Sequence, residues 1–94
     1  MDRFQLTLTD CEPVVVTRRI TDVAVSEMEG ARRGWGPMKD VAINYLLLGL
    51  HKAMRREHRE ITPEQYEDFR DALEDYQDLG DDATSPLDQE SSAR

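Results

Sequence analysis

The residue types that most often catalyse reactions or bind metals are scarce in this chain, which has two histidines and one cysteine. His51 and His58 are seven residues apart, so on a helix they lie about two turns from each other. Metal-binding pairs on a helix are usually three or four residues apart, and Cys11 has no second thiol. We therefore predict no metal site and interpret both histidines as surface residues.

Catalytic patterns of other kinds are also missing. A nucleophilic Ser, Thr or Cys needs a base that a third group orients, and Cys11 has no evident base partner. No glycine-rich loop stands between a strand and a helix, as phosphate-binding motifs require. Residues 34–37, Gly-Trp-Gly-Pro, are instead interpreted as a connection between helices. We predict that the protein is not an enzyme and binds no cofactor.

The composition predicts one small domain with unevenly placed charge. The chain has 94 residues, 38% of them hydrophobic, and a net charge of -8. Residues 1–59 hold 10 basic and 8 acidic side chains, a net charge of +2, whereas residues 60–94 hold 2 and 12, a net charge of -10. The longest nearly apolar run, residues 42–50, is far shorter than the ~20 residues that span a membrane. Since residues 1–10 also lack the apolar stretch of a signal peptide, we expect a cytoplasmic protein without membrane contact.

Hydrophobic patterning predicts an α+β fold. Phe4, Leu6 and Leu8 alternate with polar residues, and β-branched residues follow at 14–17, which predicts a β-hairpin over residues 4–17. An isolated hairpin is only marginally stable in water, so its apolar face is expected to rest on helices.

Three helices are expected, at about residues 22–33, 38–58 and 63–79. In the first, Val23, Met28 and Ala31 form a candidate apolar stripe. The second is apolar on nearly every side, which is typical of a buried central element.

The third helix is predicted from a capping box at Thr62 and Gln65 and from aromatic residues spaced three or four apart, with Gly80 after its end. Residues 1–79 are thus expected to form one domain, and residues 80–94 a disordered acidic tail.

Charged residues suggest two kinds of partner. Arginine pairs are a common feature of nucleic-acid-binding proteins, but the net charge of -8 and the acidic third helix would repel phosphates, so we predict no nucleic-acid partner. A better use for them is contact with the acidic helix of a neighbouring copy, with solvated faces as the alternative. The residues proposed for this charge-paired assembly are Arg55, Arg56, Arg59, Asp68, Asp71 and Asp75.

The order of motifs resembles a known family. The hairpin FQLTLTDCEPVVVT is followed by TRRITDVAVSEME, a Gly-Trp pair, the apolar helix ending LGLHKAMRRE, and ITPEQYEDFRDALEDY before an acidic end. This layout, over about residues 4–79, is similar to that of the small tail assembly chaperones of long-tailed, siphovirus-type phages and prophages of actinobacterial hosts. Cys11 stands where a glycine would be more typical of the turn.

The resemblance implies a non-enzymatic function. Such chaperones bind the tape measure protein, keep its apolar helices soluble and help to recruit tail tube subunits during assembly. It also implies action in the bacterial host cytoplasm, absence from the mature virion and, in some members, a longer frameshifted form.

The central helix has more apolar surface than two short helices and a hairpin can obviously cover, so we expect some of that surface to bind a client or a second copy in a homo-oligomer. The candidates for these contacts, each with core packing as the alternative, are Trp35, Tyr45, Leu48, Tyr66, Phe69 and Tyr76.

Two other functions stay open. An acidic inhibitor that mimics DNA would explain the net charge of -10 over residues 60–94. A small DNA-binding regulator would use residues 38–58 as its recognition helix, although this segment is more apolar than groove contacts require.

Overall fold

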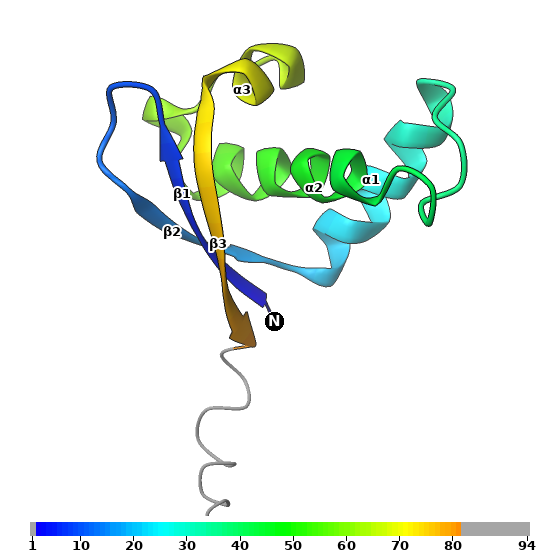
Figure 1. The fold of residues 1–94 in the computed structure, drawn as a ribbon, viewed down its shortest axis with the longest axis horizontal. Coiled ribbons are helices and arrows are strands. Elements are labelled where there is room, and N and C mark those ends of the chain that lie inside the picture. Colours follow the sequence, from blue (N-terminus) through cyan, green and yellow to red (C-terminus); the bar gives the residue numbers. More distant parts are fainter. Residues whose placement is uncertain (1, 82–94) are drawn as a thin grey trace, which may run out of the picture.

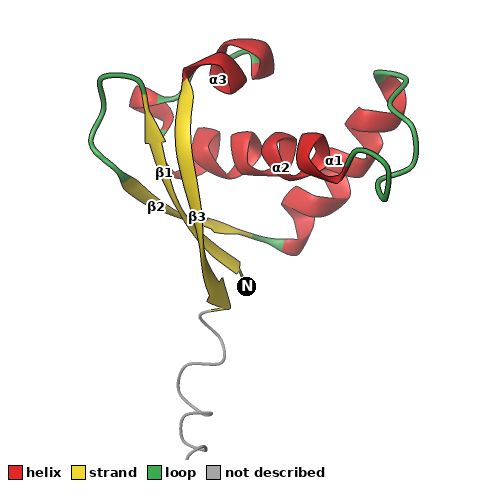
Figure 2. Ribbon diagram, viewed as in Figure 1, coloured by secondary structure: helices red, strands yellow, loops and turns green. Residues whose placement is uncertain are grey.

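A computed structural model describes residues 2–81 as a three-stranded antiparallel sheet with helices packed on one of its faces (Figure 1, Figure 2). This confirms the predicted α+β class, with an N-terminal hairpin and three α-helices. Part of the predicted tail, residues 82–94, lies outside the described residues. The elements are, in chain order, β1 (Asp2–Leu8), β2 (Val14–Arg18), α1 (Ile20–Arg32), α2 (Ala42–Glu57), a 3-10 turn (Arg59–Ile61), α3 (Tyr66–Ala72) and β3 (Leu73–Asp81).

The hairpin forms as the alternating pattern predicts. The strand order is β2-β1-β3, so β1 lies in the middle of the sheet and places Phe4, Leu6 and Leu8 in the core. Phe4 is opposite Val16 of β2. Between the two strands Asp10 adopts a positive φ of 62°, a conformation that Asp and Asn tolerate better than most residues.

The predicted helix over residues 63–79 is wrong in its second half. The helix ends at Ala72, and Leu73 begins β3, which pairs with β1 so that Leu8 is opposite Leu73 and Leu6 is opposite Tyr76. This pairing joins segments more than 60 residues apart in the sequence, and it gives β1 a second neighbour whose backbone pairs with its own. The predicted domain boundary at residue 79 therefore falls inside β3.

The residues predicted to begin and end the helix over residues 63–79 have other roles in the structure. Gln65, not Thr62, is the residue at the N-cap of α3. The Thr62 hydroxyl instead donates a hydrogen bond to the carbonyl oxygen of His58, over 2.6 Å. Gly80 lies near the end of β3 with a φ of 89°, next to an irregularity in the pairing with β1.

Helix α2 is the central element, as predicted, but it begins at Ala42 and not at residue 38. It lies against the sheet, against α1 and against α3 (Figure 1). The apolar core gathers around it, and the buried members are Phe4, Leu6, Leu8, Val16, Leu48, Leu50, Ala53, Met54, Tyr66 and Phe69.

Helix α1 packs on α2 through its small and polar residues, and the predicted apolar stripe is wrong. The buried residues of α1 are Asp22, Ser26 and Gly30, spaced four apart. A Cβ atom at Gly30 would overlap the ring of Tyr45, so only glycine allows this close helix approach. Met28, a member of the predicted stripe, is 65% exposed.

Candidate functional site

One face of α2 is covered by the sheet at one end only. Leu50 and Met54 on this face are fully buried in the core. One and two turns earlier, Leu46 and Leu47 are only partly buried and Ile43 is 49% exposed. At Ile43, Leu46 and Leu47 the first turns of α2 therefore present an apolar surface that the rest of the described chain covers only in part.

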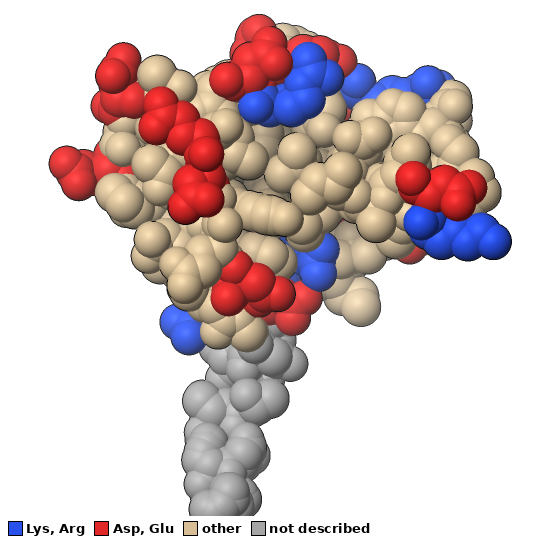
Figure 3. Space-filling view, viewed as in Figure 1, with Lys and Arg blue, Asp and Glu red and all other residues tan. Residues whose placement is uncertain are grey.

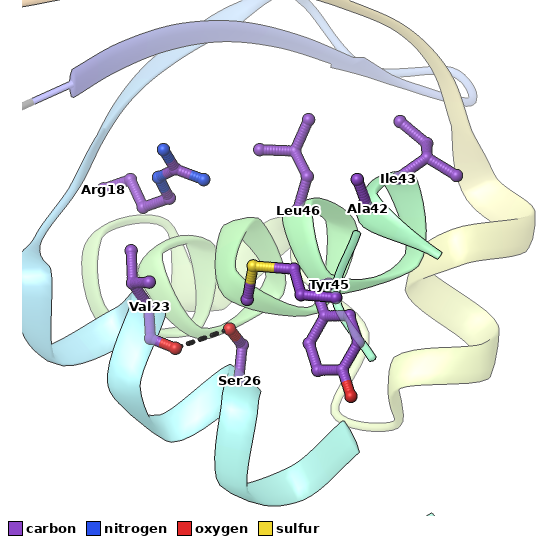
Figure 4. A pocket seen from close by; sticks show the side chains of 8 residues that line it. Arg18, Val23, Ser26, Ala42, Ile43, Tyr45 and Leu46 are labelled. Atoms are coloured by element: carbon purple, nitrogen blue, oxygen red, sulfur yellow. Dashed lines mark hydrogen bonds between the residues drawn. The ribbon is translucent and has the colours of Figure 1, made fainter. Parts of the chain in front are cut away.

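A hollow of about 470 Å³ lies over these first turns of α2 (Figure 4). Ile43 and Leu46 of α2 project to one side of it, and Val23 and Ser26 belong to the facing helix α1 (Figure 4). The Ser26 hydroxyl donates a hydrogen bond to the carbonyl oxygen of Val23, so it is already used within α1. The lining residues are Arg18, Val23, Ser26, Met38, Ala42, Ile43, Tyr45 and Leu46.

A second hollow of about 340 Å³ lies between α2 and the edge strand β3. Ile43 lines both hollows, so they adjoin at this side chain, one toward α1 and the other toward β3; we call the two together the α2 groove. Figure 3 shows acidic side chains over the course of β3 and a mostly uncharged surface beside them. The residues that line the second hollow are Ile43, Leu47, Leu73, Glu74, Asp75 and Tyr76.

Most of the aromatic and apolar residues predicted to contact a client are core residues. Leu48, Tyr66 and Phe69 are buried, as the alternative of core packing expects, and their role as contact residues stays a prediction. Tyr66 and Phe69 are buried because α3 packs on α2, with Phe69 against the ring of His51.

Of the other three candidates, Trp35 and Tyr76 reach the surface. Trp35 is partly buried and packs edge-on against Tyr45, with 5.3 Å between ring centroids. Tyr45 is buried, lines the groove from below and donates a hydrogen bond to the carbonyl oxygen of Gly36. Tyr76 is 36% exposed and lines the β3 end of the groove.

The structure separates the residues proposed for charge-paired assembly into two groups. Arg55 donates a hydrogen bond to the carbonyl oxygen of Thr62, and Arg56 forms an ion pair with Asp22 at 2.7 Å. This contact with Asp22 raises the pKa of Arg56 above its ordinary value. Both arginines are thus engaged within the chain, and their role between copies stays a prediction.

The remaining members of that set are exposed. Asp71 forms an ion pair with the neighbouring Arg70 at 3.3 Å. Among residues 2–81, Arg59, Asp68 and Asp75 have exposed side chains without an ion-pair partner. These three residues stay available for contacts between molecules.

His51 is not the surface residue that the sequence predicts, since it is only 4% exposed. Its Nε2 lies 2.9 Å from the carbonyl oxygen of Pro63, a contact in which the protonated nitrogen donates. Burial lowers the pKa of His51, and the positive charges of Lys52 and Arg55 act in the same direction.

The lowered pKa of His51 predicts a pH dependence of stability. The unfolded chain binds this proton more readily, so the free energy of unfolding should fall as the pH drops below the ordinary value of 6.5. His51→Gln should flatten this fall between about pH 6.5 and pH 5, above the range in which Glu29 and Glu67 titrate. Urea unfolding at a series of pH values measures this slope, and equal slopes in both proteins would contradict the assignment.

The lining of the α2 groove is mostly apolar. Within residues 2–81, no group of three or more His, Cys, Asp or Glu side chains is arranged to hold a metal ion. Across the same residues, none of the helices combines the length and the apolar character needed to cross a bilayer. Four lining residues are not among the contact residues predicted from the sequence: Ile43, Leu46, Leu47 and Leu73. The all-round apolar pattern of the central helix was the only signal for the first three.

Comparisons with known proteins add no relative. The chain matches no model of a known protein family, and searches of curated proteins and of solved structures find no similar protein.

Proposed function

We propose that this protein is a non-enzymatic tail assembly chaperone that binds an apolar helix of a phage tape measure protein in the α2 groove. The observation that carries the proposal is the half-covered face of α2, where Ile43, Leu46 and Leu47 continue the core pattern of Leu50 and Met54 into open surface. The resemblance of the motif order to tail assembly chaperones supplies the identity of the client.

An apolar helix suits such a groove for physical reasons. An amphipathic helix binds by placing residues three and four apart into an apolar channel, and each square ångström of apolar surface removed from water contributes about 25 cal/mol. The groove offers such a channel, with α1 on one side and β3 on the other. A client helix bound in the groove would bury the apolar face of α2 that the chain itself buries only from Leu50 onward.

The structure supports the two alternative functions, a DNA-binding regulator and an acidic DNA mimic, less well than the chaperone proposal. A regulator that reads DNA with residues 38–58 would need an exposed, polar helix, whereas α2 is the central helix of the core. An acidic DNA mimic would need no apolar groove, although the acidic β3 and α3 are compatible with it. In our proposal the protein acts in the bacterial host cytoplasm, yields its client as tail tube subunits assemble, and is absent from the mature virion.

Ile43→Glu is expected to weaken binding of the tape measure protein at least about tenfold, because it places a charge in the middle of an apolar contact. Isothermal titration calorimetry with a soluble tape measure segment measures the change. Val25→Glu is a matched control, since Val25 is also a β-branched helical residue of similar exposure, 44%, and does not line the groove. Equal binding by both variants, with folding intact, would contradict the assignment of the groove.

We also propose that the protein forms a homo-oligomer, and the outer face of α1 is the candidate contact. Ile20 and Met28 lie two turns apart on this face and are the most exposed large apolar side chains of the described residues. Ile20→Glu combined with Met28→Glu should therefore shift the molecular mass toward that of the single chain, 10.8 kDa. Light scattering after size exclusion measures the mass, and an unchanged mass for an oligomeric protein would exclude this face.

A further inference from the structure

The α2 groove has one charged rim. Glu74 and Asp75 line its β3 end, and Asp78 follows along the same edge strand. All three side chains are exposed, and none has an ion-pair partner within residues 2–81. We call these residues the acidic rim; acidic side chains follow β3 beside the uncharged surface in Figure 3.

The opposite end of the groove does not balance this charge. Arg18 is the single basic residue among the lining residues, and its guanidinium forms an ion pair with Asp2 at 2.7 Å. The same guanidinium lies over the ring of Phe4, 5.3 Å from its centroid. Arg18 is therefore neutralised within the chain, and the acidic rim leaves the groove with a negative border.

From these observations we infer that the client helix is amphipathic, with lysine or arginine side chains bordering the apolar face that enters the α2 groove. This inference rests on the proposed function and adds the chemistry of the partner to it. An apolar face would cover Ile43 and Leu47, and basic side chains beside it would reach Glu74 and Asp75 across the rim. Opposite charges at the border of an interface fix its register and accelerate association, and added salt screens both effects.

The acidic rim also has a purely structural explanation, and the test must distinguish it from a role in client binding. Charged side chains on an edge strand prevent sheets from joining edge to edge, and β3 is such a strand. If that were the whole role, neutralising the rim would promote aggregation and leave the preference among ligands unchanged.

Three synthetic peptides test the inference by fluorescence anisotropy with the full chain. The first is a helix with leucines at positions i, i+3, i+4 and i+7 and lysines beside them. The second replaces the lysines with glutamates, and the third carries a central proline that breaks the helix. At low salt the lysine peptide should bind at least about tenfold more tightly than the glutamate peptide, and the ratio should shrink as salt is added. The proline peptide should bind more weakly than its unbroken counterpart.

A variant of the acidic rim assigns the preference to its residues. Glu74→Gln, Asp75→Asn and Asp78→Asn together should bring the affinity ratio of the lysine and glutamate peptides close to one. The matched control neutralises two acidic residues outside the groove, Glu64→Gln with Asp68→Asn, and should keep the ratio.

The outcomes distinguish this inference from the proposed function. Tight binding of the lysine and glutamate peptides with equal affinity would overturn the basic border and leave the apolar groove intact. Binding of neither peptide would overturn the proposed function itself. Equal binding of the proline peptide would show that the groove takes an extended segment, which would contradict a helical client.

Discussion

Phe69→Ala is expected to lower the free energy of unfolding by about 3–5 kcal/mol. The Phe69 side chain is fully buried and packs against the ring of His51, 5.0 Å between centroids. Truncation removes most of its apolar surface from the core and leaves a cavity between α3 and α2. Because small domains are stable by only about 5–15 kcal/mol, much of the population should unfold in mild denaturant, and urea titration followed by circular dichroism measures the loss.

The same variant separates a core role from a contact role for Phe69. Ile43→Ala is the control, since Ile43 is half exposed and its truncation should cost far less. A loss below about 1 kcal/mol for Phe69→Ala, with weakened client binding, would contradict the burial of Phe69 and restore its predicted contact role.

Asp22→Ala is expected to cost about 2–3 kcal/mol of stability. The Asp22 carboxylate accepts hydrogen bonds from Nη1 and Nη2 of Arg56, at 2.7 and 2.9 Å, and from the backbone N–H of Arg19 at 2.8 Å. This expected loss of stability is smaller than for a fully buried ion pair, because the Arg56 side chain is 31% exposed and water can reach it. Chemical denaturation of the variant measures the loss.

A double-mutant cycle with Arg56→Ala isolates the pair. If Asp22 and Arg56 stabilise each other within one chain, the double variant should lose less stability than the sum of the single variants, at any protein concentration. A coupling that appears only at high protein concentration would instead place Arg56 between copies, as the sequence suggests.

The pattern of apolar and polar residues within one segment was enough to predict the first strand of the hairpin. The alternation of Phe4, Leu6 and Leu8 predicts a one-sided strand, and β1 buries those side chains. It failed at Leu73 and Tyr76, whose spacing from Tyr66 and Phe69 also fits a helix. The choice between helix and strand there depends on pairing with β1, near the opposite end of the described chain.

Helix α1 shows a second limit. Its apolar residues suggest an inward stripe, yet Asp22, Ser26 and Gly30 face α2. The close approach at Gly30, and the ion pair that Asp22 forms with Arg56, decide this orientation. Both depend on the residues that α2 presents, which no periodicity within α1 reveals.

The sequence predicts that some apolar surface of the central helix is uncovered, but not where on the helix that surface lies. The apolar excess of the central helix predicts uncovered surface, and the structure contains such surface at Ile43, Leu46 and Leu47. Which turn of α2 stays open depends on where the sheet ends, and therefore on β3, the element that the sequence pattern assigned wrongly. Two of the aromatic candidates, Tyr66 and Phe69, are buried because α3 packs on α2 before the chain enters β3.

The most direct test of the central claim is a map of the bound client on the protein. Chemical shifts of the isotope-labelled full chain, recorded while a tape measure segment is added, identify the residues whose surroundings change. If the client binds in the α2 groove, the largest changes should occur at Ile43, Leu46, Leu47, Leu73 and Tyr76. Changes centred instead on the outer face of α1, at Ile20 and Met28, or the absence of any change at saturating client, would contradict it.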